Sequence, residues 1–100
     1  MFKVKSGGTL ILSDIILDGG ASFFFTETDL VNKNISNCLS GIAADDGPLI
    51  YNNGGNIELN SGSVLQNNWM VYSSAIPGGA GIFMDGGTAV MNGGEIKNNY

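Results

Sequence analysis

The chain has 100 residues, enough for one domain, and a formal net charge of −5 at pH 7. It contains no Arg and no His, and its four cationic side chains are Lys3, Lys5, Lys33 and Lys97. Nucleic acids and anionic membrane surfaces are therefore not expected as partners, because both require a basic face. The single cysteine, Cys38, excludes an intramolecular disulfide framework and is interpreted as a small buried hydrophobic residue.

The amino-terminal segment predicts neither a targeting signal nor a membrane span. Residues 1–5 lack a long apolar run, and the apolar run TLILSDIIL at residues 9–17 is interrupted by Ser13 and Asp14. Such a run is too short to cross a bilayer. We therefore expect the chain to be cytosolic or a piece of a longer protein.

Short segments that alternate apolar and polar residues follow one another along the chain, and this pattern predicts β-strands. No segment carries apolar residues at i, i+3, i+4 and i+7 for long enough to predict a helix. Gly and Asn, which favour turns, separate the segments. The predicted strands are residues 2–4, 10–12, 50–52, 57–59, 64–66, 82–84, 89–91 and 96–98.

A repeat connects the later strands. The segment GGNIELNSGSVLQNN begins at Gly54, and GGTAVMNGGEIKNN begins at Gly86, 86 − 54 = 32 residues later. Comparison of residues 47–68 with residues 79–100, without gaps, gives seven identical pairs of 22. Such self-similarity predicts stacked copies of one structural unit. The identical pairs are Gly47/Gly79, Ile50/Ile82, Gly54/Gly86, Gly55/Gly87, Asn60/Asn92, Gly62/Gly94 and Asn67/Asn99, and Val64/Ile96 is among those that keep their chemistry.

Two earlier copies are predicted nearer the amino terminus. Residues 7–13, GGTLILS, match residues 86–92, GGTAVMN. A degraded copy without the Gly pair is placed at residues 23–37, where VN at residues 31–32 and ISN at residues 35–37 match the later copies. The sequence therefore predicts about four coils.

Stacking of these coils predicts the fold. Three short strands cannot bury an apolar face alone, but they can when equivalent strands pair in parallel about 4.8 Å apart. We predict one all-β domain, residues 1–100, folded as a parallel β-helix (β-solenoid). Asn60 and Asn92 are expected to form a ladder of side-chain hydrogen bonds, extended by Asn32, with Ser13 in its place in the first copy. The alternative is that these residues only form turns.

The stretches GGTLILSDIILDGG and GIFMDGGTAVMNGGEIKNN resemble coils of the right-handed parallel β-helix, the pectin-lyase-like fold. They are most similar to the Gly-Gly and Asn-rich repeats of bacterial surface proteins and polymorphic outer-membrane-type adhesins. The resemblance covers most of the chain except residues 38–47 and 69–78. It implies a right-handed coil and an extracellular or cell-surface location. It leaves the function open, because the same fold carries lyases, hydrolases, adhesins and phage tail parts.

The chain lacks the catalytic residues that the resemblance would imply for an enzyme. Pectate-lyase-type enzymes use an Arg base beside a calcium-binding acidic cluster, and polygalacturonase-type enzymes combine several Asp with a His and an Arg. Asp45-Asp46 is interpreted as a solvated turn, because adjacent carboxylates in such a loop seldom have the separated pKa values that acid–base catalysis needs. No motif supports calcium binding through Asp14, Asp18 and Asp85. We therefore expect no catalytic residue, no metal and no cofactor.

An outward stripe of aromatic side chains is the predicted contact surface. If Ile50 and Ile82 point inward, then Tyr51 and Phe83 point outward one above the other, and Phe25 continues the stripe in the degraded copy. Such a stripe can lie against sugar rings. The alternative is that it packs only on itself or lies beneath the following loop.

That loop, WMVY at residues 69–72, is apolar and long for a coil corner. Trp69 and Tyr72 are therefore expected to cover part of the protein or to contact a partner. Together with the aromatic stripe, they form the candidate surface for a cell-surface polysaccharide or protein.

The two ends of the predicted stack show no polar or helical cap. The chain is therefore expected to be an excerpt of a longer solenoid or a unit that associates with itself through its ends. The first function that we predict is a non-enzymatic structural or adhesive module of an extracellular or cell-surface protein. The alternatives are a subunit of a homopolymeric extracellular filament and a carbohydrate-binding or polysaccharide-processing fragment.

Overall fold

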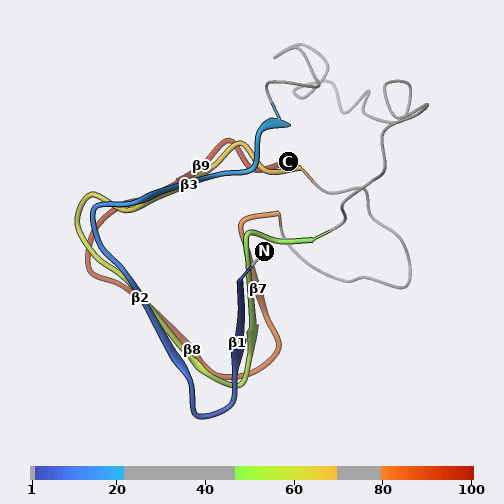
Figure 1. The fold of residues 1–100 in the computed structure, drawn as a ribbon, viewed down its shortest axis with the longest axis vertical. Coiled ribbons are helices and arrows are strands. Elements are labelled where there is room, and N and C mark those ends of the chain that lie inside the picture. Colours follow the sequence, from blue (N-terminus) through green and yellow to red (C-terminus); the bar gives the residue numbers. More distant parts are fainter. Residues whose placement is uncertain (1, 22–46, 70–79) are drawn as a thin grey trace.

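The computed structural model describes residues 2–21, 47–69 and 80–100. The described chain runs through nine strands, and each successive group of three makes one turn (Figure 1). We call these turns coil 1 (β1–β3), coil 2 (β4–β6) and coil 3 (β7–β9). The strands are β1 (Phe2–Lys5), β2 (Thr9–Leu12), β3 (Ile16–Asp18), β4 (Ile50–Asn53), β5 (Asn56–Leu59), β6 (Val64–Gln66), β7 (Ile82–Met84), β8 (Thr88–Met91) and β9 (Glu95–Lys97).

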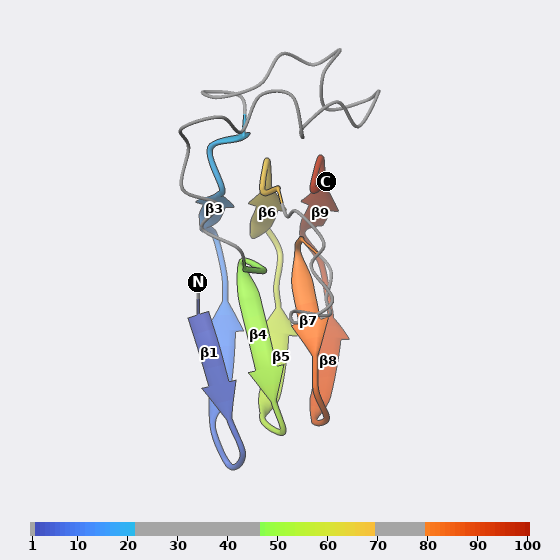
Figure 2. The same cartoon turned by 90° about the vertical axis from the view of Figure 1, so that its right-hand side faces the viewer.

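Equivalent strands of the three coils pair in parallel and form three sheets. Sheet A has the order β1-β4-β7, sheet B the order β2-β5-β8, and sheet C the order β3-β6-β9. Viewed along the stack, the sheets form three sides around a common interior (Figure 1), and from the side the three coils lie next to one another (Figure 2). The prediction of an all-β parallel β-solenoid is confirmed.

The described residues form three coils, whereas the sequence predicted about four. Strands β1, β2 and β3 pair directly with β4, β5 and β6, so no further coil stands between coils 1 and 2. The degraded copy predicted at residues 23–37 lies outside the described residues. The match between residues 7–13 and 86–92 is confirmed, because Thr9 and Thr88 are both register partners of Asn56.

The gap-free alignment of coils 2 and 3 is wrong in sheet C. In sheet B, Ile57 pairs with Ala89, 89 − 57 = 32 residues later, as the sequence predicted. In sheet C, Leu65 pairs with Ile96, only 96 − 65 = 31 residues later. The corner between β8 and β9 is therefore one residue shorter than the corner between β5 and β6. As a result Leu65, and not Val64, is the partner of Ile96.

The hydrophobic core is formed by buried side chains of coils 1 and 2. In coil 2 the inward-facing Ile50, Ile57 and Leu65 are fully or almost fully buried, because coils 1 and 3 cover them from both sides. Among the described residues, the outer coils have a neighbouring coil on one side only. Phe2 and Met91 are exposed there, whereas Val4 and Leu12 of coil 1 are still buried against coil 2. Burial of apolar area in this fold therefore depends on the neighbouring coil.

The glycine pair of each copy allows this close stacking. Gly55 and Gly87 directly precede β5 and β8 of sheet B, and each faces the preceding coil. A Cβ atom at Gly55 would lie 2.5 Å from the carbonyl oxygen of Lys5 in coil 1. A Cβ atom at Gly87 would overlap with the carbonyl oxygen of Gly55, and Gly87 also has a φ of +81°. The repeated glycines are thus required by contact between coils.

Candidate functional site

The predicted aromatic stripe lies on the outer face of sheet A. Lys3, Tyr51 and Phe83 are register partners in β1, β4 and β7, and they point outward because the preceding residues in each strand point inward. The rings of Tyr51 and Phe83 stack with their centroids 5.2 Å apart and their planes inclined by 11°. The Nζ of Lys3 lies 5.1 Å from the centroid of the Tyr51 ring. We call this row of three side chains the sheet A ridge.

The ring orientation decides what the sheet A ridge can contact. The ring separation is close to the spacing of paired strands, so the ring faces turn toward the neighbouring coils and the ring edges turn outward. Phe83 covers one face of Tyr51, and the ammonium of Lys3 lies over the other face. The members of the stripe therefore pack on one another, and contact of the stripe with a sugar stays a prediction. Only Phe83 has a ring face turned away from the other members of the ridge.

The hydroxyl of Tyr51 donates a hydrogen bond of 3.0 Å to Oδ2 of Asp85 in the next coil. This hydrogen bond raises the pKa of Tyr51 above its ordinary value of 10.0, and partial desolvation and the negative charge of Asp85 raise it further. All of these effects favour the neutral phenol. The neutral phenol therefore contributes its full stability to the fold at pH values below the ordinary pKa of 10.0. This stability is lost as the pH rises through the raised pKa.

We expect Asp85→Ala to lower the pKa of Tyr51 toward 10.0, because the variant removes both the acceptor and the negative charge. Ultraviolet titration of phenolate formation measures this pKa. The chain has three tyrosines, so the same titration of Tyr51→Phe identifies the signal of Tyr51 by difference. An unchanged pKa in Asp85→Ala would show that the two side chains are not hydrogen-bonded in solution.

The predicted ladder connects all three coils at the corner that follows sheet B. The Nδ2 of Asn60 donates to the hydroxyl of Ser13 at 3.2 Å, and the Nδ2 of Asn92 donates to Oδ1 of Asn60 at 3.0 Å. Asn92 also donates to Glu58 at 3.1 Å. The ladder thus uses the residue types and the register that the sequence predicted. Asn32, its other predicted member, lies outside the described residues.

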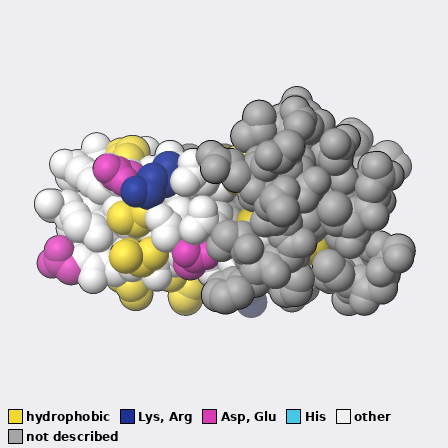
Figure 3. Space-filling model, turned by 90° about the horizontal axis from the view of Figure 1, so that it is seen from above, with side chains coloured by type: hydrophobic (Ala, Val, Ile, Leu, Met, Phe, Trp, Pro, Cys, Tyr) yellow, Lys and Arg dark blue, Asp and Glu magenta, His cyan; other side chains and the backbone are white. Residues whose placement is uncertain are grey.

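A second set of polar contacts connects coils 1 and 2 on sheet C, on the side of the molecule shown in Figure 3. The carboxylate of Asp18 accepts hydrogen bonds from the amide of Gly20 at 2.8 Å, from Gln66 at 2.8 Å and from Asn67 at 2.9 Å. These three donors stabilise the carboxylate and lower the pKa of Asp18, the Gly20 amide most strongly. On coil 3, Lys97 and Glu95 form an exposed ion pair at 2.7 Å.

Sequence reasoning missed Asn52, a fully buried polar residue in the middle coil. Its Oδ1 accepts from the amide of Gly55 at 2.8 Å, and its Nδ2 donates to the carbonyl oxygens of Gly55 at 3.1 Å and Thr88 at 3.2 Å. Its register partners are Val4 and Met84, so the repeat contains no polar residue at this position in the other coils. In the sequence, Asn52 is marked by its position two residues before the pair Gly54-Gly55.

Trp69 is the other predicted contact residue that lies within the described residues. Trp69 is buried, with 6% of its surface exposed, and its contact with a partner stays a prediction. Phe25, Cys38, Tyr72 and Asp45-Asp46 lie outside the described residues. Within the described part of the chain, Tyr51 and Phe83 are therefore the predicted contact residues that the structure brings together.

Within residues 2–21, 47–69 and 80–100, no three His, Cys, Asp or Glu side chains are placed to share a metal ion. No helix in this described part of the chain is long and apolar enough to cross a membrane.

Comparison with protein-family models, with curated proteins and with solved structures finds no significant match.

Proposed function

We propose that the chain is a non-enzymatic structural module of an extracellular or cell-surface protein, with the right-handed pectin-lyase-like coil that its repeats resemble. The observation that carries the proposal is that outward polar side chains form hydrogen bonds between the coils. Asp18, Asn60 and Asp85, which point away from the interior, each form a hydrogen bond with the neighbouring coil. A catalytic surface needs such groups aimed at a substrate, whereas here they hold the coils together. The resemblance to adhesin repeats supports the extracellular assignment.

The module would act by presenting a stiff, ridged surface to a cell-surface polysaccharide or protein. Its stiffness follows from the parallel pairing in three sheets, supplemented by the side-chain ladder and the sheet A ridge. Because these rows run along the stack, they repeat the same side-chain spacing at every coil. Adhesion to a repeating partner is the role that this arrangement suits best.

A double-mutant cycle on the sheet A ridge tests its structural role. We expect Tyr51→Ala and Phe83→Ala to be coupled by about 0.5–1.5 kcal/mol in the free energy of unfolding, because either substitution alone removes the ring stacking. Chemical denaturation of the parent, both single variants and the double variant measures this energy. A coupling near zero, together with loss of binding to a glycan panel in both single variants, would instead show that the ridge is a sugar site.

An assay for cleavage of polygalacturonate and other acidic polysaccharides tests the absence of enzymatic activity. We expect no release of new chain ends. Cleavage that is lost in Asp18→Asn or Asp85→Asn would contradict the proposal, because it would give those carboxylates a catalytic role in place of the structural one.

The second candidate function is a subunit of a homopolymeric extracellular filament. The observation that favours it is the exposure of inward-facing apolar side chains at both ends of the stack: Phe2 in coil 1 is 48% exposed, and Met91 in coil 3 is 52% exposed. In coil 2, equivalent positions are buried by the neighbouring coils. Surfaces of this kind are suited to association in a head-to-tail manner, which yields open fibres.

A further inference from the structure

The coil 3 end of the stack exposes apolar side chains that belong to the interior of the fold. Met84, Met91 and Ile96 point inward in β7, β8 and β9, but they are 39%, 52% and 45% exposed, because no coil of the described residues covers them on the far side. The backbone edges of the same three strands have no partner strand among the described residues. This end therefore combines an apolar surface with three open strand edges.

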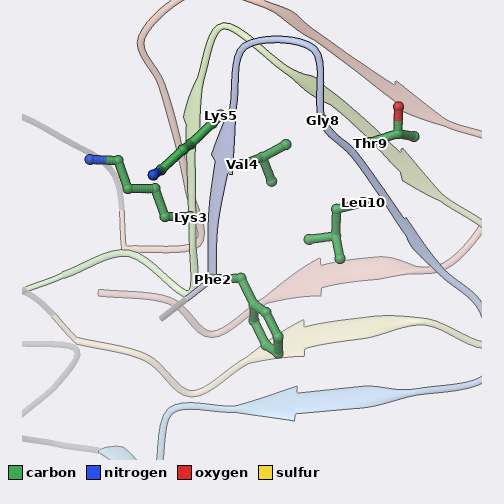
Figure 4. A pocket seen from close by; sticks show the side chains of 7 residues that line it. All are labelled: Phe2, Lys3, Val4, Lys5, Gly8, Thr9 and Leu10. Atoms are coloured by element: carbon green, nitrogen blue, oxygen red, sulfur yellow. The ribbon is translucent and has the colours of Figure 1, made fainter.

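The coil 1 end carries a hollow of about 270 Å³ between β1 and β2. In Figure 4 the side chains of Phe2, Val4 and Leu10 point into this space, and those of Lys3 and Lys5 point to the outside of sheet A. The strands β1, β2 and β3 are edge strands of their sheets on this side. The hollow is thus the open interior of the solenoid, bordered by positive charge.

We infer that the coil 3 end of one molecule docks on the coil 1 end of a second copy of this chain, in the register that the coils already use. Strand β7 would pair with β1 of the second copy, β8 with β2, and β9 with β3. The inference rests on the second candidate function and deepens it, because it names the partner and the alignment. The register follows from coil 2, whose strands pair with both outer coils.

The interior side chains match in this register. Every inward-facing residue of coil 3 meets an apolar residue of the second copy, so no polar group is buried between them. The exposed methionines suit this contact, because their flexible side chains fill irregular space such as the hollow beside β1. The pairs, with the second copy named last, are Ile82 with Phe2, Met84 with Val4, Ala89 with Leu10, Met91 with Leu12 and Ile96 with Leu17.

The charges match as well. Asp85 follows Met84 and so occupies the register place of Asn53, which pairs with Lys5. Lys97 and Asp18 are both partners of Gln66. Docking therefore brings Asp85 to Lys5 of the second copy, and Lys97 to Asp18 of the second copy. Two oppositely charged pairs at separate sheets fix the orientation of the contact.

Contacts that hold the coils together within one molecule would be reproduced between molecules. Lys3 of the second copy would lie over the second ring face of Phe83, as Lys3 lies over Tyr51 within the chain. The hydroxyl of Ser13 of the second copy would donate a hydrogen bond to Oδ1 of Asn92, as Nδ2 of Asn92 donates to Oδ1 of Asn60 in the coil before it. The sheet A ridge and the side-chain ladder would both continue across the contact.

Gly8 gives a steric argument for the same contact. It occupies in coil 1 the register place of Gly55 and Gly87, where a Cβ atom would clash with the preceding coil. At Gly8 the nearest atom to such a Cβ is the carbonyl oxygen of Lys5, 3.0 Å away and in the same coil. The coil 1 end therefore already has the small residue that close approach of another coil requires.

Sedimentation velocity over a range of concentrations tests the inference, with two matched variants in the same strand. Met91 and Val90 are adjacent in β8 and are both 52% exposed, but Met91 points toward the docking surface and Val90 points outward. We expect the parent and Val90→Lys to form larger species as concentration rises. Met91→Lys should weaken association at least about tenfold, because it places a charge in the apolar contact. Circular dichroism verifies that all three are folded.

A charge exchange provides the second test. Lys5→Asp and Asp85→Lys each bring like charges together at the contact, so each should weaken association, and the double variant should restore it. A parent that stays monomeric at every concentration would overturn the inference and point to a further coil of the same polypeptide as the occupant. Association that persists in Met91→Lys, or a double variant that is not restored, would also overturn it. A folded monomer without polysaccharide cleavage would leave the structural module proposal standing.

Discussion

Leu65→Ala is expected to lower the free energy of unfolding by about 2–5 kcal/mol. Leu65 is fully buried in β6, with Leu17 of coil 1 on one side and Ile96 of coil 3 on the other. Truncation would remove apolar contacts to both neighbouring coils and leave a cavity that the strands cannot close, because their backbones are fixed by hydrogen bonding. A loss of this size is a large fraction of the stability of a 100-residue domain.

Val64→Ala is the matched control for Leu65→Ala. Val64 is adjacent in the same strand, points outward and is partly exposed, so its truncation should cost less than about 1 kcal/mol. Urea unfolding followed by circular dichroism gives both values. Greater destabilisation by Val64→Ala than by Leu65→Ala would contradict the register of sheet C.

The second large effect is expected for Asn52→Ala. The side chain of Asn52 satisfies the amide of Gly55 and the carbonyl oxygen of Thr88, so the substitution would leave buried backbone groups without these hydrogen bonds. Each such group costs about 1–3 kcal/mol, and the total loss should exceed about 2 kcal/mol. Asn52 also connects coil 2 to coil 3 through Thr88. The loss should therefore be accompanied by faster amide hydrogen exchange in β8.

Asn53→Ala is the control for this prediction, because Asn53 is the next residue of β4 and is exposed. Its substitution should change the free energy of unfolding by no more than about 0.5 kcal/mol. Equal effects of Asn52→Ala and Asn53→Ala in thermal unfolding would show that Asn52 is not the buried hydrogen-bonding centre of the coil.

The repeat made most of the fold predictable. A strand and a corner recur where the sequence recurs, so the alignment of Asn60 with Asn92 was sufficient to place both residues in one ladder. The alternation of Ile50 and Tyr51 likewise predicted which side chain points inward. Both inferences needed only the period-2 geometry of strands and the constant spacing of stacked coils.

What the sequence could not predict depends on contacts that do not recur. The corner NSGS at residues 60–63 and the corner NGG at residues 92–94 differ by one residue but share their Asn and a Gly, so the sequence alignment did not show the change in length and misplaced Ile96. Asn52 has apolar partners in the adjacent coils, so no repeat indicates it. The burial of Trp69 is a tertiary effect that an apolar loop sequence leaves open. The sequence also did not predict that the edge of the Tyr51 ring points outward, because this depends on the rotation of the side chain.

Methyl–methyl nuclear Overhauser effects in the core test the direct stacking of three coils most directly. The account predicts contacts from the Leu65 methyl groups to those of Leu17 and Ile96, residues that are far apart in the sequence but adjacent in sheet C. Observation of both contacts would establish that coil 2 lies directly between coils 1 and 3. Contacts between Val64 and Ile96, or the absence of contacts between Leu17 and Leu65, would contradict the account.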